Sequence, residues 1–364
     1  MIFRYFDMDE IMKIGELPRA KLSSWPTPFE RLTNLSKHLG GPNIFIKRDD
    51  LISLAFGGTK TRGLECVFAD ALAKRADTII TVCSLHGNLS TQVAAAARKL
   101  GMQAIIIARD PTGYYPPHVL DGNLLLKRIL GAVIEPVTGE KNTESGRAAA
   151  TERAQKIGEE LKEEGRKPYL VVENNPLWAA GIANAIPELV SQSEEEDIDI
   201  GYLVHTSAYG ATQAGLVLGA TALETGIKVI GIANGYEPKR VVSSRIAEIA
   251  NASAQLLGLN FSTSAEAITL LDDYVGEGYG TIDQFTLDTV KLVAETEGIF
   301  LDPVYTARGM LGLVNLIRTR YFKREDNVVF IHTGGLPSLF GYREPLTAML
   351  ASREPLWTKP AWIR

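Results

Sequence analysis

The sequence predicts an α/β protein with two open, twisted αβα domains and a ligand cleft between them. Its 364 residues exceed the length at which a single hydrophobic core stops growing, so two domains are expected. Short apolar strands alternate with helical patterns along the chain, which is typical of parallel sheets covered by helices on both faces. The alternation restarts after Lys167, which indicates two such sheets.

The first set of elements runs from residue 43 to residue 164. Strands are expected at short apolar runs such as DTIITVC and QAIIIA. Helices are expected over an Ala-rich stretch and over a long polar one, among others. The expected strands cover 43–48, 77–83, 103–108 and 132–136, and the expected helices cover 64–75, 88–100, 121–130 and 143–164.

The second set of elements begins at residue 168. The expected strands cover 168–172, 201–205, 228–233 and 327–332, and the expected helices cover 178–192, 212–225, 238–256 and 283–297. The acidic run at 193–197 is expected to be a solvated loop. We therefore expect a larger domain of residues 1–54 and 168–364, a smaller inserted domain of residues 55–167, and a hinge at 165–167.

The composition argues against several classes of protein. The net charge is −5 and no basic tract is present, so neither a nucleic acid nor a membrane is an expected partner. No apolar run approaches the ~18 residues that span a bilayer, and the first residues lack an apolar stretch of signal-peptide type. Cys66 and Cys83 form neither a CxxC pair nor a metal-ligand cluster. We expect a cytoplasmic protein without disulfides or a metal site.

The first candidate site residue is Lys60, in the segment FGGTKTRG. Gly57 and Gly58 let the backbone turn sharply and approach a ligand closely. Lys60 precedes the helix expected from about Leu64, and a helix N-terminus disfavours an extra positive charge. Together with partial desolvation, this setting lowers the lysine pKa and makes the amine nucleophilic toward an aldehyde. Taken alone, such a segment is more often a turn with a surface lysine.

Two strand-to-helix turns place polar groups at the carboxyl ends of strands, where open α/β sheets bind ligands. In the first, SLHGN, Asn88 is a favoured helix cap, and His86 alone is more often a turn residue than a catalyst. The second, HTSAYGATQAG at 205–215, offers small residues, hydroxyls and a helix N-terminus that suit a dianionic phosphate. It lacks the Walker lysine and the glycine spacing of a dinucleotide site.

Later turns add two tyrosines and a histidine. Tyr279 lies in GEGYG, Tyr305 in LDPVYT and His332 in FIHTGGLP. Singly, tyrosines near turns are usually packing residues with a wet hydroxyl, and a histidine at a strand end is usually structural. Only together with the other segments do these residues indicate a functional site.

The five segments, in this order and at these separations, resemble the family of 1-aminocyclopropane-1-carboxylate (ACC) deaminase and D-cysteine desulfhydrase. The resemblance extends from about Trp25 to Tyr342 and rests on IKRDDL, FGGTKTRGLE, LDPVYT and FIHTGGLPSLFGY. It implies pyridoxal-phosphate fold type II, a homodimer, and pyridoxal 5'-phosphate (PLP) as the cofactor in the cleft between the domains. The substrate that it implies is a small amino acid.

The resemblance also implies individual roles. Lys60 matches the Schiff-base lysine, Asn88 the asparagine that contacts the ring hydroxyl, and residues 210–212 the phosphate cup. Tyr279 and Tyr305 match two active-site tyrosines. The cofactor-binding residues expected are Lys60, Asn88, Ser207, Tyr209, Gly210, Ala211, Thr212 and Thr306, and the catalytic residues expected are Lys60, Tyr279, Tyr305 and His86.

Thr306 falls where the family places the residue that faces the pyridine nitrogen. ACC deaminases are expected to carry a glutamate there, which keeps that nitrogen protonated and the ring a strong electron sink. A threonine is a neutral partner, so the carbanion is less delocalised. Elimination tolerates the weaker sink because a leaving group on Cβ takes up the electrons, whereas opening of a cyclopropane ring needs the stronger one. Thr306 therefore favours a desulfhydrase-like reaction.

The sequence departs from the family pattern near the expected substrate. His86-Gly87-Asn88 stands where the family shows Gln-Ser-Asn, so the serine hydroxyl that contacts substrate is missing. Tyr209 and Ala211 stand where serine and glycine are typical. We expect cofactor binding to survive these changes. We hypothesise that His86 or Tyr209 reshapes the carboxylate pocket for a different amino acid.

We therefore predict a PLP-dependent lyase that converts a small amino acid to a 2-oxo acid and ammonia by α,β-elimination. Lys60, displaced by the substrate amine, takes the Cα proton, and Tyr279 or Tyr305 assists the leaving group. One alternative is ACC-like ring opening, and others are β-replacement or racemisation. A PLP-binding protein without turnover and a binding protein without cofactor are further alternatives.

Overall fold

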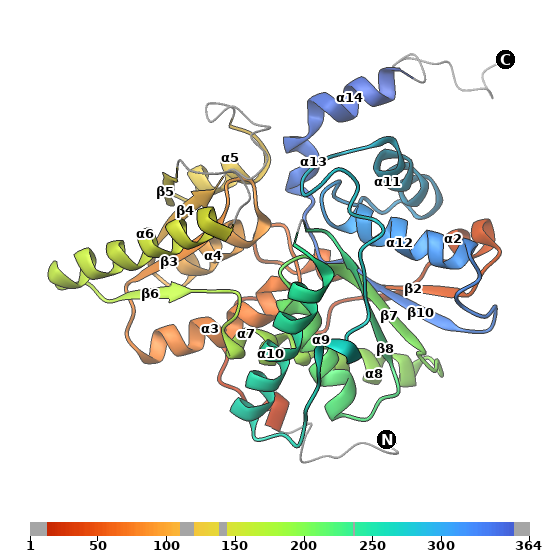
Figure 1. Cartoon of the computed structure of the whole chain (residues 1–364), viewed down its shortest axis with the longest axis horizontal. Coiled ribbons are helices and arrows are strands. Elements are labelled where there is room, and N and C mark those ends of the chain that lie inside the picture. Colours follow the sequence, from red (N-terminus) through yellow and green to blue (C-terminus); the bar gives the residue numbers. More distant parts are fainter. Residues whose placement is uncertain (1–12, 110–119, 138–143, 236, 353–364) are drawn as a thin grey trace.

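The computed structural model describes residues 13–109, 120–137, 144–235 and 237–352, which form two sheets flanked by helices (Figure 1). The predicted α/β class with parallel sheets is confirmed. In the described ranges, no helix is long and apolar enough to cross a membrane.

The larger sheet has six strands in the order β1–β2–β10–β7–β8–β9. Neighbouring strands run parallel, except that β1 and β2 are antiparallel. On the central strand, Val329 is fully buried and pairs with Phe45 on one side and Leu203 on the other. The strands are β1 (Phe29–Arg31), β2 (Asn43–Lys47), β7 (Tyr202–Ser207), β8 (Lys228–Ala233), β9 (Leu270–Leu271) and β10 (Asn327–Ile331).

The smaller sheet has four parallel strands in the order β5–β4–β3–β6. They are β3 (Thr78–Ser84), β4 (Gln103–Arg109), β5 (Val133–Pro136) and β6 (Pro168–Val171). β6 begins at the first residue of the second predicted segment of the larger domain, yet it pairs with β3 of the smaller sheet. The exact division into domains stays a prediction.

The helices form layers on both sheets. On the smaller sheet lie α4 (Asn88–Lys99), α5 (Gly122–Ile129) and α6 (Glu144–Glu163). On one face of the larger sheet, α3 (Lys60–Ala73), α7 (Pro176–Ala183), α9 (Ala211–Ala222) and α10 (Lys239–Leu257) pack on one another, whereas α2 (Thr33–Leu39), α11 (Gln284–Glu297) and α12 (Thr306–Arg318) cover the opposite face (Figure 1). The short α13 (Pro337–Gly341) contacts α5 and is followed by α14 (Arg343–Ala351).

Several elements differ from their predicted form. The helix predicted at 178–192 is two helices, because α7 ends at Ala183 and α8 (Ala185–Glu195) begins after Asn184. The acidic run is therefore not a loop: α8 continues through Glu195, since glutamate favours helix, and the chain turns only at Asp197 with a φ of 56°. The helix predicted from about Leu64 begins earlier, at Lys60.

Candidate active site

A cavity lies between the carboxyl ends of the two sheets. Its lining includes the ends of β3 and β7 and the first residues of α3, α4 and α9. Of the residues predicted to bind the cofactor or catalyse, the cavity brings together Lys60, Asn88, Ser207, Tyr209, Gly210, Ala211, Thr212, Tyr279 and Tyr305. These positions are far apart in the sequence, so the fold assembles the set.

Lys60 is the first residue of α3, and its half-buried side chain lines the cavity. Burial lowers the pKa of its amine, and the negative charges of Glu173 and Asp302 oppose part of that effect. Nζ lies 5.5 Å from the centroid of the Tyr305 ring. A lowered pKa enlarges the neutral, nucleophilic fraction of this amine.

The loop before Lys60 is held tightly. Gly57 has a φ of 79°, and a Cβ there would lie 1.9 Å from the carbonyl oxygen of Asp50, so only glycine fits. The next amide, that of Gly58, donates to Asp49 O at 2.8 Å, and the Thr59 amide donates to Thr333 O at 3.3 Å. These bonds fix where α3 begins.

Asn88 is the first residue of α4, with Gly87 before it at the N-cap position. The expectation that Asn88 caps this helix is wrong, since no side chain makes a cap hydrogen bond there. Its Oδ1 instead accepts from Asn123 Nδ2 at 2.5 Å and from Ser338 Oγ at 3.4 Å. Because Oδ1 is occupied, the amide NH₂ is the group left to donate to a ligand.

The turn from β7 to α9 forms an anion cradle. Gly210 has a φ of 110°, and the first turn of α9 carries no acidic residue and no side-chain cap. Within the described chain, Ser207 Oγ is buried without a hydrogen-bond partner. Backbone N–H groups, a helix dipole and a free hydroxyl suit a dianionic phosphate. The residues present thus fit the phosphate of PLP.

Charged side chains beside this cradle were not predicted from the sequence. The guanidinium carbons of Arg245 and Arg147 lie 4.4 and 5.4 Å from the centroid of the Tyr209 ring. Arg245 Nη1 donates to Tyr209 O at 3.2 Å, and both arginines form ion pairs with Glu237. The cluster joins α6, α10 and the β8–α10 loop, so no local pattern marks it.

Glu173 is a second residue that sequence reasoning missed. It lines the cavity two residues after the end of β6. Burial raises the pKa of its carboxyl group, while the positive charges of Lys60 and Arg147 oppose that shift. Its position at the carboxyl end of a predicted parallel strand was the sequence feature that could have indicated a site residue.

Tyr279 and Tyr305 contribute two hydroxyls that hydrogen-bond to each other, with their rings edge to face at 5.8 Å. Burial raises the pKa of Tyr279 to about 12 and that of Tyr305 well above its usual value. Both therefore stay protonated at neutral pH. Asp302 fixes the turn before α12, since its Oδ2 accepts from the Tyr305 amide at 2.9 Å.

Two predicted site residues lie outside the cavity lining. Thr306 is fully buried, and its Oγ1 donates to Asp302 Oδ1 and accepts from the Asp302 amide, both at 2.8 Å. The backbone oxygen of His86 accepts from Asn123 Nδ2 at 3.1 Å. Neither residue lines the cavity, and their predicted roles stay predictions. Among the described residues, no group of three or more His, Cys, Asp or Glu suits a metal ion.

Comparisons with known proteins identify the family of the chain. Residues 21–334 match the family described as pyridoxal-phosphate dependent enzyme. A putative ACC deaminase of Pyrococcus horikoshii is 36% identical over 339 residues, which cover 93% of this chain and 98% of that protein. A D-cysteine desulfhydrase of Klebsiella pneumoniae is 36% identical over 340 residues, covering 92% and 99%.

A solved structure agrees as well. The crystal structure of an ACC deaminase homologue matches with a TM-score of 0.84 and 34% identity, covering 94% of this chain and 99% of that chain. The chain belongs to the family of pyridoxal-phosphate-dependent enzymes.

Proposed function

We propose that the chain eliminates a leaving group from Cβ of a small amino acid and releases a 2-oxo acid and ammonia. The observation that carries this proposal is the arrangement of Lys60: a desolvated amine opens into the same cavity as an anion cradle and a pair of protonated tyrosines. PLP, when bound, supplies the electron sink for negative charge that develops at Cα. The chain's own residues supply the rest.

Lys60 is the proposed base for the Cα proton, because burial favours its neutral form. The start of α4 is the proposed site for the substrate carboxylate, since Gly87, Asn88 and Leu89 line the cavity there at a helix N-terminus. Glycine at position 87 leaves these backbone groups open but offers no hydroxyl.

The tyrosine pair is the proposed acid for the leaving group. The two hydroxyls share one hydrogen bond, so one of them retains a proton to donate. Their raised pKa values keep that proton in place until a strongly basic leaving atom develops. A thiolate leaving from D-cysteine is a weaker base than a tyrosinate, so the pair would stabilise it by donating a hydrogen bond.

Elimination is favoured over ring opening by Thr306. This residue follows Tyr305, and its hydroxyl is already engaged by Asp302. As a threonine, it also offers no ionised carboxylate that could hold a proton on the pyridine nitrogen. The relatives include proteins named D-cysteine desulfhydrase and putative ACC deaminase, and the two reactions release different oxo acids.

A panel of D- and L-amino acids tests the proposal. The PLP-loaded chain is incubated with D-cysteine, L-cysteine, ACC, D-serine and other small amino acids, and oxo-acid release is measured. We expect pyruvate from at least one amino acid with a leaving group on Cβ. Release of a four-carbon oxo acid from ACC alone would instead establish ring opening.

We also propose a cytoplasmic homodimer. Leu51, Phe56 and Phe300 border one surface hollow and are 53, 60 and 57% exposed, which is unusual for large apolar side chains on a monomer. Cys66 and Cys83 are buried and unpaired, in keeping with a reducing compartment. Sedimentation of wild type and of Phe56→Ser tests the dimer, which the variant should weaken.

A further inference from the structure

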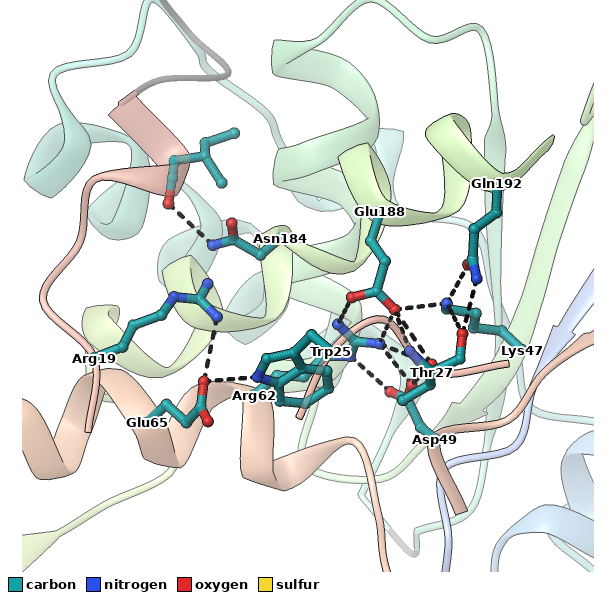
Figure 2. Close-up of polar contacts among 11 residues, drawn as sticks. Arg19, Trp25, Thr27, Lys47, Asp49, Arg62, Glu65, Asn184, Glu188 and Gln192 are labelled. Carbon is teal, nitrogen blue, oxygen red and sulfur yellow. Dashed lines mark hydrogen bonds and ion pairs between the residues drawn. The ribbon is translucent and has the colours of Figure 1, made fainter. Parts of the chain in front are cut away.

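A buried cluster of charges lies next to Lys60 and has no part in the proposed chemistry. It consists of Lys47, Asp49, Arg62 and Glu188, and we call it the Asp49 cluster (Figure 2). Three of its members come from the segments IKRDDL and FGGTKTRGLE, which carry the family resemblance. Charged residues of these two segments therefore meet in one buried cluster.

Arg62 is the centre of the cluster and is 1% exposed. Its Nε and Nη2 donate to the two oxygens of Asp49 at 2.8 and 2.7 Å. Its Nη1 and Nη2 donate to the two oxygens of Glu188 at 2.8 and 2.9 Å. Figure 2 shows the guanidinium between these carboxylates. Two forked contacts hold one planar group in a single orientation.

The cluster is balanced in charge and almost closed to water. Lys47 is 1% exposed, and its Nζ lies 2.6 Å from Glu188 Oε1 and donates to Thr27 O at 2.7 Å. Two cations thus face two anions. Removal of one carboxylate charge leaves a buried cation without compensation, which is costly. Such an arrangement tolerates one geometry and resists small shifts.

Asp49 accepts hydrogen bonds from residues on both sides of Lys60. Its carbonyl oxygen accepts from the Gly58 amide at 2.8 Å, two residues before Lys60. Its carboxylate binds Arg62, two residues after Lys60. Asp49 itself lies in a turn directly after β2, a strand of the larger sheet. The backbone around Lys60 is thereby anchored to the larger sheet.

We propose that Asp49 and Arg62 are positioning residues for Lys60, which hold the backbone on either side of it and so direct its amine into the cavity. The inference rests on the proposed function, in which that amine reacts. A displacement of about 1 Å at a reacting group costs on the order of 100-fold in rate. The cluster is therefore expected to control the reactivity of Lys60 and not only the stability of the fold.

Glu65 provides a matched control. It is 2% exposed, lies on the same helix and accepts from the Leu22 amide at 3.1 Å and Trp25 Nε1 at 3.0 Å. Like Asp49, it anchors α3 to another segment (Figure 2). Its side-chain hydrogen bonds join residues 19–25 and not the loop before Lys60. Glu65 reaches Arg62 only through Trp25, whose ring centroid lies 4.4 Å from the Arg62 guanidinium carbon, so loss of Glu65 tests mainly stability.

The experiment compares Asp49→Asn, Arg62→Lys and Glu65→Gln, each as the full chain loaded with PLP. Three quantities are measured: the thermal midpoint, the pH titration of the visible absorption of PLP joined to Lys60, and kcat and KM for an active amino acid. We expect all variants to lower the midpoint. Only Asp49→Asn and Arg62→Lys should shift the titration and lower kcat, by about 10- to 100-fold, with a smaller change in KM.

Equal losses of stability with an unchanged titration and kcat in Asp49→Asn would overturn the inference. If Asp49→Asn does not fold, Arg62→Lys decides, because lysine keeps the charge but cannot make two forked contacts. Borohydride reduction of the wild type separates the two proposals. Failure to trap PLP on Lys60 defeats the proposed function, whereas trapping with an unaffected Asp49→Asn defeats only the positioning role.

Discussion

The hydroxyls of Tyr279 and Tyr305, which lie on two separate turns, are joined by a hydrogen bond. One turn precedes α11 and the other begins α12, so the pair exists only in the folded chain. Lys60 Nζ stands 5.5 Å from the Tyr305 ring. The proposed base and the proposed acid thus line the same cavity.

This pairing predicts that the two tyrosines act as a unit. Tyr279→Phe and Tyr305→Phe should each lower kcat about 100-fold, because each removes part of one proton-donating pair. The double variant should be little worse than the more damaged single variant, since groups that act together give non-additive losses. Tyr202→Phe, on β7, is the control and should retain full activity. Multiplicative losses in the double variant would argue for independent roles.

Glu173 is predicted to set the pH range of the reaction. Its negative charge raises the pKa of Lys60 against the larger lowering by burial. In Glu173→Gln the Lys60 pKa should fall further, so the acid limb of the kcat–pH profile should move to lower pH. Glu237→Gln removes a carboxylate that is paired with Arg245 and should leave that limb in place. A limb that moves to higher pH in Glu173→Gln would contradict this account.

Gly210→Ala is predicted to weaken PLP binding. The alanine would be strained at a φ of 110°, and its Cβ would lie 2.6 Å from Cγ1 of Ile246 beneath the anion cradle. Gly226→Ala is the matched control, because Gly226 also has a positive φ of 73° but no atom within 4 Å of such a Cβ. We expect at least a 10-fold rise in the PLP dissociation constant for Gly210→Ala only, measured by absorbance titration. This corresponds to about 1.4 kcal/mol.

Much of this fold and site could be predicted from the sequence, because the information was local. Short apolar strands and the glycines before Lys60 are visible within a few residues, and the resemblance linked the separate segments. The charges around Tyr209 were not predictable in this way. Arg147, Glu237 and Arg245 come from α6, a loop and α10, and each looks like an ordinary surface residue until the sheets bring them together.

Thr306 illustrates a different limit. The family resemblance predicts that it faces the pyridine nitrogen, and its hydroxyl is engaged by Asp302, four residues earlier. Whether the Thr306 hydroxyl points to a ligand or to the Asp302 carboxylate depends on the rotamer of Thr306, which the sequence does not specify. Tyr209 lines the cavity and His86 does not, so of the two residues expected to reshape the substrate pocket, Tyr209 is the better first target for substitution.

The Asp49 cluster gives a final prediction, which concerns stability at low pH. Burial alone would raise the pKa of Glu188, but the hydrogen bond and charge of Arg62 and the charge of Lys47 lower it from 4.5 to about 2. A carboxyl group with a depressed folded-state pKa stabilises the protein above its unfolded-state pKa and loses that contribution as pH falls. The window here is therefore about pH 4.5 to pH 2, and the contribution is on the order of 3 kcal/mol.

Urea unfolding at a series of pH values measures this contribution. The free energy of unfolding of the wild type should fall more steeply between pH 4.5 and pH 2 than that of Glu188→Gln, which carries no titrating group at this position. At pH 7 the variant should be the less stable protein, because Lys47 and Arg62 then lose a buried counter-charge. The two curves should approach each other as the pH falls, and parallel curves would show that Glu188 is not the group whose protonation weakens the cluster.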